Sequence, residues 1–218
     1  MTVKLLSLRA REALGRGNPL FIKIFAIIIC SFFLSSCSVF SPVKTEHVDT
    51  YNLTATSHTI TKYSSRKMTI LVTPVESTPV YNTTQMAYTM KPYHIAYFVK
   101  NRWISTPAEM LHPLIVQSLQ NTHYFRAVTE KPSMGHYDYI LNVQLIKLQQ
   151  EFLSQSSQIH LILDVQLLNS ASQNIIATRR IDIYEHVLQP TPYAGVIAAN
   201  IATERALKQI TRFCLNKT

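Results

Sequence analysis

Three polar side chains in two neighbouring apolar segments are the candidates for acid–base chemistry. His160 and Asp164 share one face of the first segment, and Asp182 lies in the next segment along the chain. Hydrolases use an imidazole beside a carboxylate, because the carboxylate orients the ring and the ring moves a proton. Polar side chains on a solvated sheet face have the same spacing without any chemistry. A hydrolase therefore stays open as one alternative, which requires these groups to converge in a concave pocket.

Histidine, cysteine and glycine usage argues against several other kinds of site. The 8 histidines include no pair at metal-ligand spacing, and the 3 cysteines form no Cys-x-x-Cys motif. Phosphate-binding loops, dinucleotide fingerprints and nucleophile elbows need clustered glycines, but the chain has 4 glycines, widely scattered. We therefore expect no metal and no nucleotide cofactor, and no catalytic residue of those kinds.

The amino terminus reads as an export signal followed by a modification site. Residues 1–23 hold five basic residues and one acid, and residues 24–34 are uncharged and apolar. This apolar run is shorter than the ~20 residues that span a bilayer, and it is typical of a secretory signal. Leu34-Ser35-Ser36-Cys37 then resembles the bacterial lipobox. That resemblance implies diacylglycerol on Cys37, cleavage after residue 36, and a further acyl chain such as palmitate. An uncleaved short anchor helix, with Cys37 uninvolved, is the alternative.

Removal of residues 1–36 changes the meaning of the composition. The whole chain carries a net charge of +9, of which residues 1–36 contribute five positive and one negative charge, so +5 remains. That charge is too dispersed to predict nucleic-acid binding. Residues 37–47 read as a lipidated amino terminus and tether, and 48–218 as one domain. Ser38 after the cysteine resembles lipoproteins sorted to the periplasmic face of the Gram-negative outer membrane. Cys214 is expected to be a buried small hydrophobe.

Alternating and helical hydrophobic patterns define the elements that must position these groups. Strands are expected over 48–55, 68–75, 85–90, 93–100, 124–128, 137–148, 159–167 and 174–187. Of these, 85–90 and 93–100 are expected to pair as a hairpin. Helices are expected over 106–121 and 192–215, with Pro113 kinking the first helix or delaying its start. The fold class is α+β, a mixed or antiparallel sheet with two helices packed on one face.

The stretch from Met86 to Trp103 is unusually rich in aromatic residues. Aromatic and arginine side chains are enriched where proteins bind partners, and they also fill cores. Tyr88, Tyr97, Arg102 and Trp103 are therefore candidate partner-binding residues, with Trp103 favouring the core.

The order of these segments resembles the ABC-type transport auxiliary lipoprotein family. The resemblance rests on Tyr51-x-Leu53, Ile70-Leu71-Val72-x-Pro74-Val75, Gln85-Met86-x-Tyr88, Tyr97-x-x-x-Asn101-Arg102-Trp103 and Pro107, and it covers roughly residues 48–215. The resemblance implies a non-enzymatic periplasmic lipoprotein that is an accessory subunit of a transporter. Such a transporter contains an MCE-domain protein, a permease and an ATPase, and it moves lipid between the inner and outer membranes. An assembly or structural lipoprotein of another envelope complex is the alternative. A homo-oligomer stays open.

Overall fold

The computed structural model describes residues 23, 47–55, 66–132, 135–153 and 156–218, and the expected tether and Cys37 lie outside them. Residues His47–Thr218 form one compact unit. Its elements run as β1(Asp49–Tyr51), β2(Arg66–Val72), β3(Glu76–Ser77), a 3-10 turn (Pro79–Tyr81), β4(Gln85–Thr89), β5(Ala96–Trp103), α3(Pro107–Gln120), β6(Phe125–Thr129), β7(Tyr139–Glu151), β8(Gln158–Asn169), β9(Ile175–His186) and α4(Pro192–Lys217).

Strand β7 is the axis of a mixed nine-stranded sheet. On one side it pairs antiparallel with β8, which pairs antiparallel with β9. On the other side β2, β3 and β4 pair with it in succession, all parallel. The sheet then continues through β2 to β6, and through β4 to β5 and β1. Strand β7 pairs with β2 near its start and with β4 at its end. Because β7 is long, it joins the part of the sheet that contains β2 and β6 to the part that contains β4, β5 and β1.

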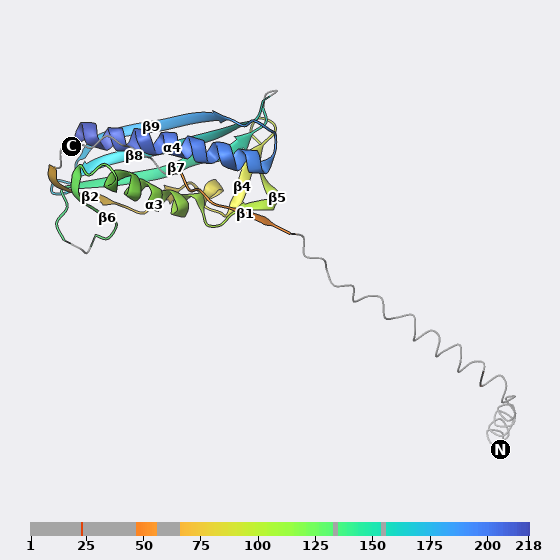
Figure 1. The fold of residues 1–218 in the computed structure, drawn as a ribbon, viewed down its shortest axis with the longest axis horizontal. Coiled ribbons are helices and arrows are strands. Elements are labelled where there is room, and N and C mark those ends of the chain that lie inside the picture. The colour runs from red at the N-terminus through yellow and green to blue at the C-terminus, as the bar shows by residue number, and fades with distance from the viewer. Residues whose placement is uncertain (1–22, 24–46, 56–65, 133–134, 154–155) are drawn as a thin grey trace, which may run out of the picture. The chain divides into compact units, whose positions relative to one another are not determined.

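Both helices lie on the same face of this sheet, as expected (Figure 1). Helix α4 packs on β8 and β9, and α3 packs beside it on β2, β6 and β7. One hydrophobic core, from Leu53 to Cys214, fills the space between the helices and the sheet. Ala199, Ala202 and Ala206 are fully buried, so small side chains let α4 approach the strands closely. The α+β prediction is confirmed.

The long strands alternate as the sequence predicts, up to one irregularity. In β8 the odd positions Leu161, Leu163 and Val165 are fully buried against the helices, and the even positions lie on the other face. In β7 a bulge between Leu145 and Lys147 adds a residue and exchanges the two faces. Beyond it, Leu148 points into the core, and Gln149 and Glu151 lie on the opposite face, cross-strand from His160 and Gln158. The pattern of alternation alone does not reveal such an insertion.

Helix α3 begins where its residues predict. The Thr106 side chain accepts a hydrogen bond from the backbone N–H of Glu109, whose carboxylate accepts one from the backbone N–H of Thr106. Pro113 does not delay the helix, which is continuous from Pro107. Pro113 is exposed, so its ring lies on the solvent side of the helix.

Other element boundaries differ from the expected ones by a few residues. The hairpin of β4 and β5 is confirmed, but β5 starts at Ala96, three residues later than the aromatic pattern suggests. The expected strand 68–75 is divided at Thr73, whose backbone N–H donates to the carbonyl of Leu141. Strand β3 then continues along β7 and places Glu76 opposite Gln144.

Candidate functional site

The face of the sheet that carries no helix holds a buried polar cluster around His160. The imidazole Nδ1 lies 2.9 Å from Oε1 of Glu151, and Nε2 lies 2.9 Å from Oδ1 of Asp182. Gln149 donates to the same Glu151 oxygen, and the Tyr81 hydroxyl donates to Gln149. His160 is 5% exposed. The five side chains come from β7, β8, β9 and the 3-10 turn, which covers this part of the sheet.

Hydrogen bonding governs the charge state of this cluster. Burial acts to raise the pKa of the Glu151 carboxyl, but hydrogen bonds from His160 and Gln149 and the charge of Lys147 outweigh it and lower the pKa. Burial, together with the negative charge of Glu151, raises the pKa of Tyr81 to about 12. Glu151 is therefore ionised and Tyr81 is a neutral donor at neutral pH, which matches the observed direction of the hydrogen bonds.

The geometry of the cluster fits a structural network better than an acid–base site. Both ring nitrogens of His160 face carboxylates, and the Tyr184 ring stacks on the imidazole at a centroid distance of 3.9 Å. A general base must present a nitrogen to the substrate, and neither nitrogen is available here. Asp164 does not join His160. It accepts two hydrogen bonds of 2.7 Å from Arg180, so the three-residue convergence that the hydrolase alternative requires is not formed.

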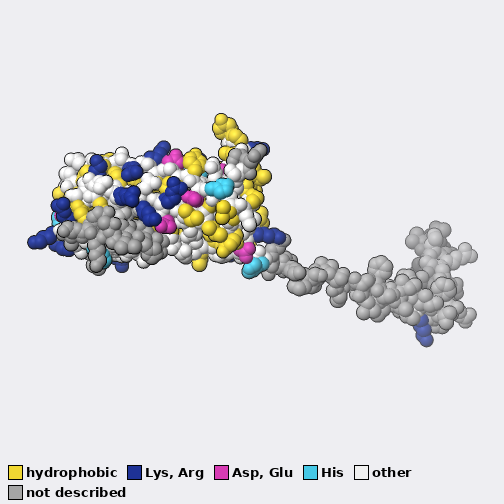
Figure 2. Space-filling model, turned by 45° about the horizontal axis from the view of Figure 1, so that its top comes forward, with side chains coloured by type: hydrophobic (Ala, Val, Ile, Leu, Met, Phe, Trp, Pro, Cys, Tyr) yellow, Lys and Arg dark blue, Asp and Glu magenta, His cyan; other side chains and the backbone are white. Residues whose placement is uncertain are grey.

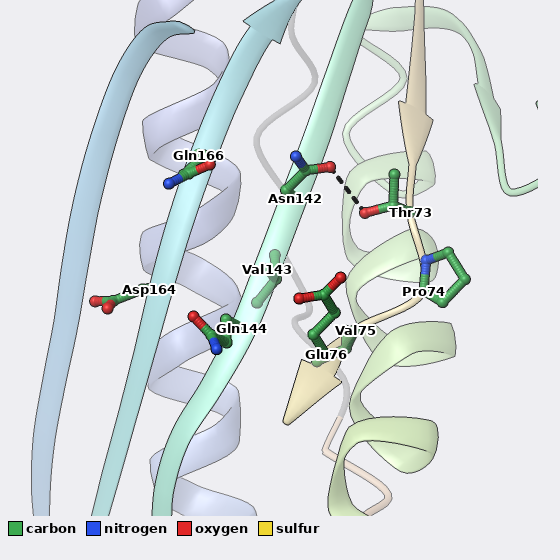
Figure 3. A pocket seen from close by; sticks show the side chains of 9 residues that line it. All are labelled: Thr73, Pro74, Val75, Glu76, Asn142, Val143, Gln144, Asp164 and Gln166. Carbon is green, nitrogen blue, oxygen red and sulfur yellow. Dashed lines mark hydrogen bonds between the residues drawn. The ribbon is translucent and has the colours of Figure 1, made fainter. Parts of the chain in front are cut away.

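A separate polar hollow of about 370 Å³ lies on the same face, between β3 and the middle of β7 and β8 (Figure 3). Asn142 and Gln144 of β7 line it, with Glu76 and Thr73 opposite and Asp164 at its side. Thr73 donates to Asn142 across the hollow, whereas the Asp164 carboxylate points away toward β9. The lining contains no histidine, serine or cysteine, and neither His160 nor Asp182 lines it. Of the three residues of the hydrolase hypothesis, only Asp164 therefore lines this hollow.

The aromatic candidates of the hairpin do not form one surface. Trp103 is 4% exposed and belongs to the core, so it is removed from the partner-binding set. Tyr97 pairs with Ala87 and Tyr88 with Ala96, so the two tyrosines point to opposite faces. Tyr97 donates to the carbonyl of Val80, and the Tyr88 ring stacks on Phe98 at 4.5 Å. Arg102 is exposed, and it stays a candidate together with the half-buried tyrosines.

The sequence did not single out Glu151, Gln149 or Tyr81, which complete the polar cluster. The run Gln149-Gln150-Glu151 at the end of an apolar strand was the available signal, but the bulge before it conceals which face each side chain occupies. Cys214 is fully buried, and burial raises the pKa of its thiol to about 12, so it packs as a small hydrophobe, as expected. No three histidine, cysteine or acidic side chains are grouped to hold a metal among the described residues.

Within the residues that the structure describes, no helix has the length and apolarity needed to cross a bilayer.

Comparison with known proteins identifies the family. The fold is similar to the crystal structure of protein XCC0632 from Xanthomonas campestris, with 16% identity, a TM-score of 0.69, and coverage of 77% of this chain and 95% of that one. It also resembles the hypothetical protein CT253 from Chlamydia trachomatis, with 8% identity, a TM-score of 0.51, and coverage of 70% and 98%. No curated protein matches the chain. The model of the ABC-type transport auxiliary lipoprotein component family matches residues 51–211. The chain therefore belongs to the ABC-type transport auxiliary lipoprotein component family.

Proposed function

We propose that this protein is an accessory subunit of an ABC-type transporter with an MCE-domain protein, anchored through acylated Cys37 to the periplasmic face of the outer membrane. In this role it docks the envelope-spanning part of the transporter, which moves lipid between the inner and outer membranes. The observation that carries the proposal is the family match over residues 51–211, which spans almost the whole described domain.

The absence of a motor in the sequence supports an accessory role. The 4 glycines are too scattered for a phosphate-binding loop, so this chain does not bind ATP in the way an ABC ATPase does. Energy for transport then comes from a partner subunit on the far side of the inner membrane. The Leu34-Ser35-Ser36-Cys37 signal and Ser38 support a subunit held at the outer membrane instead.

A non-enzymatic role is supported by the site geometry. The most buried histidine of the open face is held between two carboxylates and covered by Tyr184. The polar hollow on the same face is lined by carboxylate, amide and threonine side chains, and by no histidine, serine or cysteine. An assembly or structural lipoprotein of another envelope complex remains the alternative function.

Fractionation of cells tests the anchor. We expect the wild-type protein in the outer-membrane fraction, Cys37→Ala in a form released from membranes, and Ser38→Asp shifted to the inner membrane. Multiple acyl chains hold a protein on a bilayer almost permanently, so release should be complete. Retention of Cys37→Ala in membranes would contradict the lipid anchor.

Co-purification tests the partner. After crosslinking in cells, the wild-type protein should recover an MCE-domain protein, and Cys37→Ala should recover much less. Recovery of secretin or barrel-assembly proteins without any MCE-domain protein would favour the assembly alternative and contradict the proposal.

A further inference from the structure

Exposed apolar side chains gather at one end of the domain. Five of them come from three separate connections at that end, and a sixth comes from the start of α4: Met90, Tyr93, Ile95, Leu153, Leu188 and Tyr193. Val99, at 85% exposed, and Leu188, at 86% exposed, have nearly their whole side chains in solvent. Figure 2 shows hydrophobic side chains gathered toward one end of the domain, while most of the Lys and Arg side chains on this face are scattered over the rest of it.

The sheet topology brings these segments together. Strand β4 ends beside the end of β7, where the Phe152 N–H donates to the carbonyl of Thr89. The end of β9 lies beside the start of β8, since the Val187 N–H donates to the carbonyl of Ser157. Gln150 of β7 donates to the carbonyl of Thr191, directly before α4. The hairpin turn, the β7–β8 turn and the start of α4 therefore meet at one end.

An apolar groove of about 240 Å³ opens at the start of α4. Leu188 lines it from the β9–α4 link, and Tyr193, Ile197 and Ile201 line it from the helix. These three helix residues are spaced by four positions, so they form one exposed stripe on the outer side of α4. Residues 192–203 contain no charged side chain, whereas the rest of the helix carries Glu204, Arg205, Lys208, Arg212 and Lys217.

The chain from the modification site joins the domain beside this groove. Only residues 38–46 separate Cys37 from His47, and they reach at most ~30 Å when fully extended. Strand β1 follows directly, and the Tyr51 ring lies 5.9 Å from the Tyr193 ring. Asn200, on the same helix, donates to the carbonyl of Asn52 and accepts from the N–H of Thr54. The start of the domain is thus fixed to the apolar half of α4.

We propose that this apolar end docks on the phospholipid surface that holds acylated Cys37, with Tyr93, Val99, Leu188 and Tyr193 in contact with the lipid. The inference rests on the proposed lipid anchor. A short tether confines the end to the neighbourhood of a bilayer, and exposed tyrosine and aliphatic side chains prefer the interfacial layer of the bilayer. Lys91 in the hairpin turn adds positive charge that complements anionic headgroups.

A lipid surface fits these observations better than a protein partner. The apolar residues lie on three separate connections, on β5 and at the start of α4, and a bilayer can contact all of them without matching their shape. The site also lies where the tether begins, which makes the bilayer its nearest neighbour at high effective concentration. A protein that covers the same end, including a second copy of this chain, is the competing outcome of the test.

Spin labels on single cysteines in the acylated protein test the proposal. Leu188→Cys and Tyr93→Cys report on the apolar end, and Ile175→Cys and Lys208→Cys are matched exposed controls away from it. The native Cys214 is fully buried and Cys37 carries the lipid, so the introduced thiol is the one that reacts. The protein is placed in nanodiscs of phosphatidylethanolamine and phosphatidylglycerol, and the accessibility of each label to oxygen and to a water-soluble nickel complex is measured.

We expect labels at positions 188 and 93 to favour oxygen severalfold over the nickel complex, and labels at 175 and 208 to favour the nickel complex. Equal accessibility at all four positions would overturn the proposal, because the apolar end would then face water. Protection of 188 and 93 from both reagents would also overturn it, in favour of a protein interface. Failure of the protein to stay with the nanodiscs would overturn the anchor itself, whereas loss of the MCE partner alone would leave this result unchanged.

Discussion

The two faces of the sheet are made by neighbouring residues of the same strands, yet different forces stabilise them. On the helix-covered face, β7, β8 and β9 contribute fully buried leucines and isoleucines to one continuous core. On the other face, the same strands carry Glu151, His160 and Asp182 in hydrogen-bonded contact, and Asp164 paired with Arg180. The first face depends on apolar volume, and the second depends on every buried polar group keeping a partner.

This difference shows why buried polar residues are weak indicators of catalysis. His160 and Glu151 are as buried as many core residues, because the 3-10 turn and Tyr184 cover them. A histidine surrounded by acidic residues resembles a reaction centre in sequence, but here its ring nitrogens are already used. Substitutions on the two faces therefore test whether apolar volume and polar partners make these separate contributions.

Substitution of neighbouring residues on β8 should separate the two faces most clearly. Leu163→Ala removes a fully buried side chain from the core and should lower the free energy of unfolding by about 2–5 kcal/mol. Ile162→Ala, the adjacent residue on the open face, is the matched control and should cost about 1 kcal/mol or less. Urea denaturation followed by circular dichroism measures both. Equal losses would contradict the assignment of the core to the helix-covered face.

Removal of the imidazole should have an intermediate effect. His160→Ala leaves Glu151, a largely buried carboxylate, without the partner that lies 2.9 Å away, and it should lower the free energy of unfolding by about 1–3 kcal/mol. His160→Gln restores one donor and should recover part of the loss. An unchanged stability in His160→Ala would mean that water replaces the ring and that the cluster is not a closed network.

The acid dependence of stability should report on Glu151. The pKa of this carboxyl is lower in the fold than in the unfolded chain, so its stabilising contribution is complete above the ordinary pKa of a glutamate, 4.5, and is lost as the pH falls through the lower folded value. The free energy of unfolding, measured from pH 7 down to pH 3, should therefore fall less steeply in Glu151→Gln than in the wild type. A steeper fall in Glu151→Gln than in the wild type would contradict the lowered pKa of the Glu151 carboxyl.

The ion pair at the exposed part of the open face should matter least. Arg180 and Asp164 make two hydrogen bonds of 2.7 Å, and this pairing lowers the pKa of the Asp164 carboxyl. The arginine side chain is largely exposed, so Arg180→Ala should lower the free energy of unfolding less than the other variants do, and high salt should reduce the difference from the wild type. A loss as large as that of His160→Ala would show that exposure does not weaken the pair.

The regular helices and strands could be predicted from the sequence, but the pairing of distant strands and the bulge in β7 could not. Thr106, Pro107 and Glu109 predicted the start of α3, and the alternation in 159–167 predicted β8, because these signals depend only on adjacent residues. The pairing of β2, β3 and β4 along one strand depends on contacts between distant residues, which periodicity does not contain. The bulge in β7 also depends on the pairing with β8, so the alternation of residues did not predict which face Glu151 occupies.

The candidate site was predicted only in part. The juxtaposition of His160 and Asp182 followed correctly from strand order, but Asp164 faces Arg180 instead, as cross-strand pairing on β9 dictates. Trp103 was expected to favour the core, and it is buried there, but aromatic content alone did not separate the other candidates into core and surface. The gathering of exposed apolar residues at one end required three connections to be placed in space, and no linear pattern joins them.

Site-specific crosslinking in cells tests the central claim most directly. A photo-reactive amino acid replaces Arg102 on β5, with Arg212 near the end of α4 as the matched exposed control. The account predicts that the Arg102 position crosslinks to an MCE-domain protein in the outer-membrane fraction, and that the Arg212 position does so much less. Crosslinks from both positions to secretin or barrel-assembly proteins, with no MCE-domain protein, would contradict it.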